Sequence, residues 1–235
     1  MNAINHAATA LLINKKWPGV PLLWVLFSVQ LVECLWVVFN LVGLEAAYTE
    51  PQIRALNDIH LSHMPYSHSI ASSIALSLIA WFVLSHLLKR PRWAIAIAVA
   101  ISSHIVLDVA THVQDIQLAP GLAYPKIGSG LYGIPAIALV VETIYGIWCW
   151  WVFRGSKALL AVILIFNLGA LSFYVPQIPG PEAFLAGHPR VFAAIIGFHV
   201  FTGLAAVGYF ARSHWRAETQ QAVQADSPAV GGPVA

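Results

Sequence analysis

The stretch Ser102–His112, SSHIVLDVATH, places ionisable side chains inside a strongly apolar part of the chain. His104, Asp108 and His112 follow one another at intervals of four residues, so on a helix they share one face, each about 6 Å further along the axis. An ionised carboxylate near the centre of a bilayer costs about 2.5–3.5 kcal/mol. The stretch therefore predicts a helix whose polar face meets partners inside a bundle.

The composition predicts an integral membrane protein. Of the 235 residues, 59% are hydrophobic and 9% are charged, whereas soluble domains carry about 25% charged residues. We therefore expect an all-α fold, a polytopic bundle in the lipid bilayer. The formal net charge of +2 is too small to suggest a nucleic-acid partner. Cys34 and Cys149 lie in apolar runs and are expected to be buried thiols.

Six apolar runs are long enough to cross a bilayer, which takes about 20 helical residues. They lie near residues 20–43, 66–88, 93–112, 131–153, 158–178 and 191–211. We expect an N-terminal cytoplasmic segment over 1–19, a four-helix core holding a metal site over 20–153, two additional transmembrane helices over 154–212, and a disordered cytoplasmic tail over 213–235. The oligomeric state is not indicated by the sequence.

Basic residues predict the orientation of these spans. Nine of the twelve Lys and Arg residues fall on one side of the predicted topology and three on the other. Because the cytoplasmic side carries the excess of basic residues, both termini are expected in the cytoplasm. The chain is thus expected to be a multi-pass membrane protein.

The carboxylates within the predicted spans need neutralising partners. Glu33, Asp108 and Glu142 would together cost about 8–10 kcal/mol unpaired, which rivals the stability of a typical domain. The first four spans contain no Lys or Arg. Histidines and a cation remain as partners, and the topology lets His68 and His104 reach the same outer half of the bundle as the three carboxylates.

Mixed histidine and carboxylate ligation suits zinc, with manganese or iron as alternatives. Simpler interpretations stay open at this point. His104 and Asp108 can form a hydrogen-bonded pair that only fixes helix packing. Ser67 and Ser69 can cap a helix, and Glu45 can be a surface carboxylate.

Five motifs occur in order along residues 20–153: QLVECLW (30–36), GLE (43–45), MPYSHSI (64–70), SHIVLDVATH (103–112) and GLYGIPAIALVVE (130–142). Together they resemble the bacterial membrane-bound metal-dependent hydrolase family, whose members are small multi-pass inner-membrane proteins with Ser-His-Ser and His-x-x-x-Asp motifs. The family's motif residues fall on His68, His104 and Asp108. Its acidic residue in the first span, often Asp, is here Glu33. A Trp expected after the motif histidine is replaced by Ile105.

The resemblance implies metal-dependent hydrolase chemistry and names no substrate. The expected substrate, a lipid-like or membrane-associated ester, follows from the buried, outward-facing position of the site. The expected metal ligands are His68, His104 and Asp108, with Glu33 or Glu142 completing the shell and Glu142 preferred as general base. Residues expected to orient the ligands or to replace one of them are Ser67, Ser69, Ser103, His112 and Glu45. Two alternatives stay open: a haem-binding electron-transfer protein, and a proton or metal-ion transporter.

Overall fold

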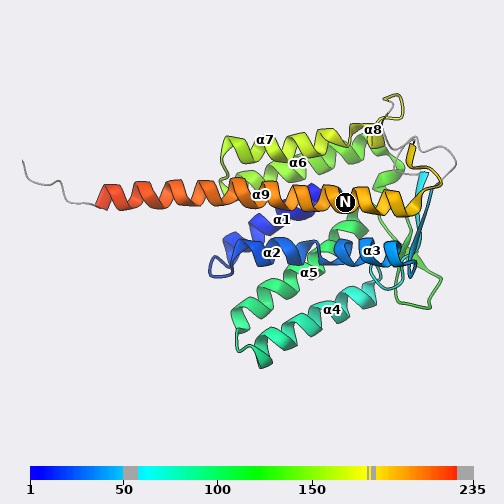
Figure 1. Ribbon diagram of the computed structural model, residues 1–235, viewed down its shortest axis with the longest axis horizontal. Coiled ribbons are helices and arrows are strands. Elements are labelled where there is room, and N and C mark those ends of the chain that lie inside the picture. Colours follow the sequence, from blue (N-terminus) through cyan, green and yellow to red (C-terminus); the bar gives the residue numbers. More distant parts are fainter. Residues whose placement is uncertain (50–57, 179, 181–183, 227–235) are drawn as a thin grey trace, which may run out of the picture.

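The structure is a computed structural model that describes residues 1–49, 58–178, 180 and 184–226. Helices dominate these residues, and two short antiparallel hairpins lie at one end of the bundle (Figure 1). The elements are α1 (Ala3–Lys16), α2 (Leu22–Val29), α3 (Leu31–Val42), β1 (Ala46–Thr49), β2 (Ile59–His63), α4 (Ile70–Phe82), a π-helical turn η2 (Val83–Leu87), α5 (Pro91–Thr111), β3 (Ile116–Gln117), β4 (Lys126–Ile127), a 3₁₀ turn η3 (Leu131–Gly133), α6 (Pro135–Phe153), α7 (Lys157–Gly169), α8 (Leu171–Tyr174) and α9 (Pro189–Asp226).

Local sequence explains where several helices begin and end. Pro91 and Pro135 occupy the first turns of α5 and α6, where a missing N–H costs nothing. The hydroxyl of Ser69 accepts a hydrogen bond from Ser72 N and caps α4. Gly43 ends α3 in the left-handed conformation, with φ of 78°, which glycine adopts without strain. These signals set the boundaries of the helices that carry the polar residues.

The structure confirms that the fold is mostly helical and that it contains helices long and apolar enough to cross a bilayer. Four helical segments of the described chain meet that requirement: Ile70–Leu87, Pro91–Thr111, Pro135–Phe153 and Pro189–Arg212. The predicted first span is instead a pair, α2 and α3, bent by 50°. The predicted span 158–178 divides into α7, of 13 residues, and the short α8. A 13-residue helix is about 20 Å long, shorter than the apolar layer of a bilayer.

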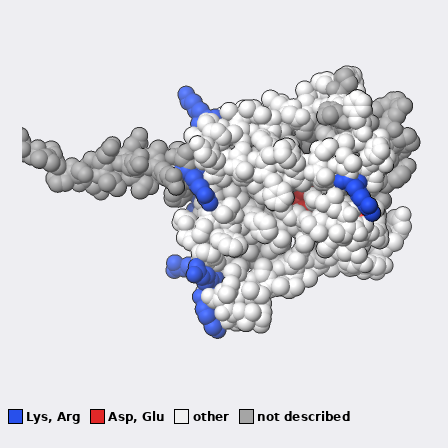
Figure 2. Space-filling view, in the orientation of Figure 1, with Lys and Arg blue, Asp and Glu red and all other residues white. Residues whose placement is uncertain are grey.

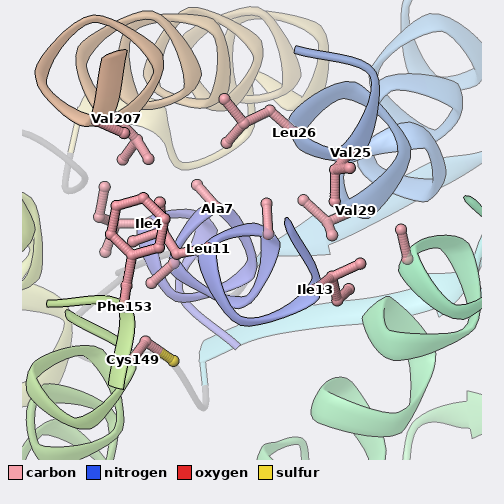
Figure 3. Packing of buried hydrophobic residues seen from close by; sticks show 14 of the residues in the cluster. Ile4, Ala7, Leu11, Ile13, Val25, Leu26, Val29, Cys149, Phe153 and Val207 are labelled. Atoms are coloured by element: carbon pink, nitrogen blue, oxygen red, sulfur yellow. The ribbon is translucent and has the colours of Figure 1, made fainter. Parts of the chain in front are cut away.

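Helix α1 lies at the centre of the bundle and contacts α2, α5, α6, α7 and α9. Ile4, Ala7 and Leu11 are fully buried, and Figure 3 shows α1 surrounded by apolar side chains from α2, α6 and α9. The sequence analysis assigned residues 1–19 to a segment outside the bundle. The structure differs: the N-terminus is marked near the middle of the bundle in Figure 1.

Helix α9 continues beyond the apolar segment to Asp226. Residues 213–226, expected to be part of a disordered tail, are therefore helical, whereas 227–235 lie outside the described residues. The helical stretch contains no Gly or Pro and is rich in Ala and Gln, which are good helix formers. Figure 2 shows several Lys and Arg side chains at the end of the bundle from which this extension leaves.

Helix α6 approaches α1 and α7 closely at Gly146. A Cβ atom there would lie 2.7 Å from Asn5 Oδ1, 2.8 Å from Ile163 Cγ2 and 3.3 Å from Asn167 Nδ2. Asn5 and Asn167 exchange hydrogen bonds through their side-chain amides, at 3.0 and 3.2 Å. Gly146 thus leaves room for the amide pair that joins α1 to α7.

Gly146→Ala is expected to lower the free energy of unfolding by about 1–3 kcal/mol, because an added methyl overpacks this contact. Gly169→Ala is the matched control. Its Cβ would meet nothing within 4 Å, so it should be neutral or stabilising by up to about 1 kcal/mol. Thermal unfolding in one detergent measures both, and equal melting temperatures for the two variants would contradict the close approach.

Candidate metal centre

Four side chains from α3, α5 and the segment before α4 converge inside the bundle. Asp108 Oδ2 lies 3.2 Å from His104 Nε2 and 3.8 Å from His68 Nε2. Glu33 Oε2 lies 3.4 Å from His68 Nε2 and 3.6 Å from His104 Nε2. The structure thus brings together the four residues expected to form a metal site, and we call them the His–carboxylate cluster.

These separations match the spacing of ligand atoms around one metal ion. Zinc binds nitrogen and oxygen ligands at about 2.0–2.2 Å, so neighbouring atoms of a tetrahedral shell lie about 3.3–3.6 Å apart. The four distances in the cluster run from 3.2 to 3.8 Å. The buried groups Glu33–His68–His104 and His6–His104–Asp108 each have ligand atoms within 4.8 Å of one another. The cluster can therefore hold a cation.

Two atoms at the centre of the cluster lack hydrogen-bond partners. His104 Nε2 and Asp108 Oδ2 are buried and unpartnered, although such groups are normally satisfied. His104 Nδ1 donates to the carbonyl of Val29 at 2.7 Å, which leaves a lone pair on Nε2 in the neutral ring. A cation between Nε2 and Oδ2 would satisfy both atoms at once.

The bend between α2 and α3 builds one side of the cluster. Helix α2 ends at Val29, and its carbonyl is free to accept from His104 because the helical pattern is interrupted at Gln30. Gln30 is fully buried and its side-chain amide donates to the carbonyl of Ala3. Glu33 then lies in the first turn of α3, where the helix dipole stabilises a carboxylate.

His68 is oriented by a buried chain of hydrogen bonds. Ser67 Oγ donates to Glu45 Oε2 at 2.6 Å, so it accepts from His68 Nδ1 at 2.9 Å. Glu45 Oε1 also accepts from the backbone N–H groups of Tyr66 and Ser67, both at 2.8 Å. This arrangement leaves Nε2 of His68 as the acceptor that faces the cluster. Glu45 is 2% exposed and therefore is not a surface carboxylate.

Ser67→Ala is expected to weaken divalent-metal affinity by about 10–100-fold, the usual effect of losing the partner that orients a histidine ligand. Ser69→Ala is the matched control, because Ser69 only caps α4 and contacts Ser72. The control should lose about 1 kcal/mol of stability and keep its metal affinity. Competition with a chromophoric chelator measures both, and equal affinities would rule out the orienting role of Ser67.

Other predicted residues occupy different positions. Ser103 Oγ donates to the carbonyl of Ala100 within its own helix and has no contact with the cluster in the described structure. His112 ends α5, with Nε2 3.8 Å from Asp108 Oδ1 and Nδ1 within 3.4 Å of Asp115. His112 thus borders the cluster on the side of Asp108 that faces away from His104.

Glu142 lies outside the cluster, and hydrogen-bond donors from other residues satisfy its carboxylate oxygens. It accepts from Tyr132 Oη at 2.7 Å, Asn2 N at 2.8 Å and Asn5 Nδ2 at 3.0 Å. Burial raises the pKa of Tyr132 well above its usual range, so the phenol keeps the proton that it donates. These contacts favour a structural role for Glu142 in place of the general-base role expected from sequence.

The sequence analysis missed His6, which α1 carries into the bundle. His6 Nε2 lies 3.1 Å from Asp108 Oδ1, and its ring stacks on that of His104 with centroids 3.9 Å apart and planes 10° apart. The N-terminal amine also contacts Asp108 Oδ1, at 2.7 Å. One signal was present: Asn2, Asn5, His6 and Thr9 recur at three- and four-residue intervals, as on one helical face.

The geometry favours a single ion over haem. A haem with two histidine ligands needs a flat macrocycle between them, but carboxylate oxygens of Glu33 and Asp108 lie within 3.2–3.8 Å of the two Nε2 atoms. A porphyrin would have to displace both carboxylates.

Comparisons with protein-family models, curated proteins and solved structures give no match for this chain. The case for a metal site therefore rests on the contacts within the cluster.

Proposed function

We propose that the protein is a membrane-embedded, divalent-metal-dependent hydrolase that cleaves a lipid-like or membrane-associated ester. One observation carries the proposal: the buried, unpartnered atoms His104 Nε2 and Asp108 Oδ2 lie 3.2 Å apart, with His68 and Glu33 within 3.8 Å. A cation between these two atoms would satisfy both of them, and buried polar atoms are normally satisfied because they have lost their hydration. The resemblance of the motifs to membrane-bound metal-dependent hydrolases supports the same chemistry.

His68, His104 and Asp108 would hold the ion, with zinc as the first candidate and manganese or iron as alternatives. When bound, a divalent ion supplies Lewis acidity and lowers the pKa of water to about 7. The three residues are well placed to fix it, because their side chains are at most 5% exposed and both histidines are oriented by hydrogen bonds through Nδ1.

We assign Glu33 the role of holding the attacking water and accepting its proton. With all four residues as ligands the shell would be complete, as in structural zinc sites, whereas catalytic sites keep one position open. Glu33 is the member best able to leave that position, since its side chain is 20% exposed and borders the cavity. Glu142 is less suited, since three donors already occupy its oxygens.

We place the protein in the bacterial inner membrane as a multi-pass protein, with the basic end of the bundle in the cytoplasm. The excess of Lys and Arg on that side supports this orientation. Glu33, His68 and Asp108 would then lie in the outer half, open to a substrate held in the bilayer. No nucleic-acid partner is proposed.

Metal-ion or proton transport is the second candidate, and the bent pair α2–α3 favours it. Transporters build ion sites at helices broken within the membrane, and here a 50° bend lies between α2 and α3, with Glu33 in the first turn after it.

The test combines metal analysis with two functional assays on the purified full chain. We expect about one zinc, manganese or iron per chain, no haem absorption band, and metal-dependent loss of ester lipids from a total bacterial lipid extract in mixed micelles, followed by mass spectrometry. Uptake of the bound metal into sealed vesicles without any lipid cleavage would favour the transporter. A wild-type protein that binds no divalent ion would overturn the hydrolase and metal-ion transport, and would leave proton transport as the only candidate of the three.

A further inference from the structure

An apolar cavity of about 260 Å³ adjoins the His–carboxylate cluster. Glu33, His68 and Asp108 form part of its wall. Most of the remaining wall is hydrophobic and comes from α3, α8, α9 and the segments beside them, including Trp36, Phe173, Leu185, Phe192, Ile195 and Ile196. A cavity of this kind accepts a hydrocarbon chain whose polar end lies at the cluster.

Helix α9 separates part of this cavity from the outer surface. Ile195 lines the cavity and is also 46% exposed. Phe198 and Phe201, on the same helix, are 71% and 57% exposed, as expected of a face turned toward lipid. The wall is therefore one side chain thick at Ile195.

The cluster reaches the surface through Glu33. The side chain of Glu33 is 20% exposed, whereas those of His68 and Asp108 are 5% and 3% exposed. A carboxylate open to the apolar belt is costly, so this opening calls for a functional explanation.

Helix α9 packs closely against the α2–α3 pair on both sides of Glu33. A Cβ at Gly197 of α9 would lie 3.1 Å from Val37 of α3, and one at Gly208 would lie 3.3 Å from Leu26 of α2. Between these two contacts the α2–α3 pair bends by 50°, and Glu33 lies in the first turn after the bend. Glu33 therefore lies along the seam between α9 and the bent pair.

We propose that this seam is a lateral entrance through which the acyl chain of a bilayer lipid enters the apolar cavity and brings its ester group to Glu33. The inference rests on the proposed hydrolase and names how its substrate is reached. The proposal also gives a role to the helices after residue 154. Helices α8 and α9 complete the cavity for the acyl chain, and this cavity lies beside the His–carboxylate cluster of the earlier helices.

Photocrosslinking in vesicles tests the entrance without relying on turnover. The full chain is reconstituted with phosphatidylethanolamine, phosphatidylglycerol and a trace of phosphatidylcholine whose acyl chain ends in a diazirine. Mass spectrometry then maps the crosslinks. We expect adducts on the buried cavity residues Phe192 and Phe173 in addition to those on the outward face. Adducts confined to outward residues such as Phe198 would overturn the proposal.

Two tryptophan variants sharpen the test. Ile196→Trp fills the cavity and is expected to lower the cavity adducts by about tenfold or more, because the indole occupies the space that the acyl chain would take. Ile144→Trp is the matched control, since Ile144 is 60% exposed on α6 and does not line the cavity, so its adducts should equal those of wild type. Equal cavity adducts in both variants would contradict the assignment.

Metal content and lipid cleavage measured on the same samples separate this inference from the proposed function. Bound metal and cleavage without cavity adducts would overturn the entrance and leave the hydrolase standing. Cavity adducts without metal or cleavage would support the entrance and remove the hydrolase.

Discussion

Asp108→Asn is expected to lose the bound metal ion, with affinity falling by more than about 100-fold, beyond the 10–100-fold effect of removing an outer partner. The substitution keeps the shape of the side chain and removes its charge. Asp108 Oδ2 lies 3.2 Å from His104 Nε2 and is buried without a partner, which is the geometry of a direct ligand. Metal analysis after gel filtration, followed by titration with added zinc, measures the loss.

Asp115→Asn is the matched control for this variant. Asp115 pairs with His112 and is not a member of the cluster, so the control should retain its full complement of metal. Recovery of stoichiometric metal by Asp108→Asn at modest excess zinc would instead make Asp108 a residue that only orients His104. Metal binding unchanged in both variants would leave Asp108 as a packing residue.

The convergence of the cluster could be predicted from sequence because it depends on helical periodicity and depth. His104 and Asp108 are one turn apart on α5, so they share a face in any helix. Successive spans cross the bilayer in opposite directions, which brings Glu33 and His68 to a depth in the membrane from which they can reach His104 and Asp108. Neither argument needs the exact boundaries of the helices. Errors of several residues in the predicted spans therefore did not affect the predicted convergence of the cluster.

Helix α1 could not be predicted by the same reasoning. Its 14 residues are too few to cross a bilayer, and Asn5, His6 and Asn14 make it less apolar than a span. Its burial depends on surrounding helices that satisfy these side chains one by one: Glu142 and Asn167 for Asn5, Asp108 for His6, and the carbonyl of Val20 for Asn14. The spacing of the polar residues indicates one helical face, but one sequence does not show which distant segments satisfy that face.

The interruption between α2 and α3 at Gln30 could not be predicted from the sequence either. No Gly or Pro lies between Leu22 and Val42, and these are the usual signals of an interrupted helix. The interruption is stabilised by tertiary contacts: the side chain of Gln30 donates to Ala3, and His104 donates to Val29. The bend that precedes Glu33 and orients His104 thus arises from packing against α1 and α5.

Glu33→Gln is expected to lower the rate of ester cleavage by about 10²–10⁴-fold, the usual contribution of a general base, while the bound metal remains. The amide keeps the size of the side chain and cannot accept the proton of the attacking water. Metal should stay bound because His68, His104 and Asp108 still surround the ion with buried, oriented atoms. The measurement pairs turnover, on whichever ester lipid the extract assay identifies, with metal content in the same preparation.

Glu142→Gln decides between the two carboxylates that have been considered for this role. Its oxygens receive hydrogen bonds from Tyr132, Asn2 and Asn5, so the amide should lower the melting temperature and leave turnover per folded, metal-loaded molecule close to wild type. The reverse result, turnover lost in Glu142→Gln and kept in Glu33→Gln, would return the general base to Glu142. Loss of metal in Glu33→Gln would make Glu33 a permanent fourth ligand. The shell would then be closed, as in structural zinc sites, and the catalytic assignment of the cluster would fail.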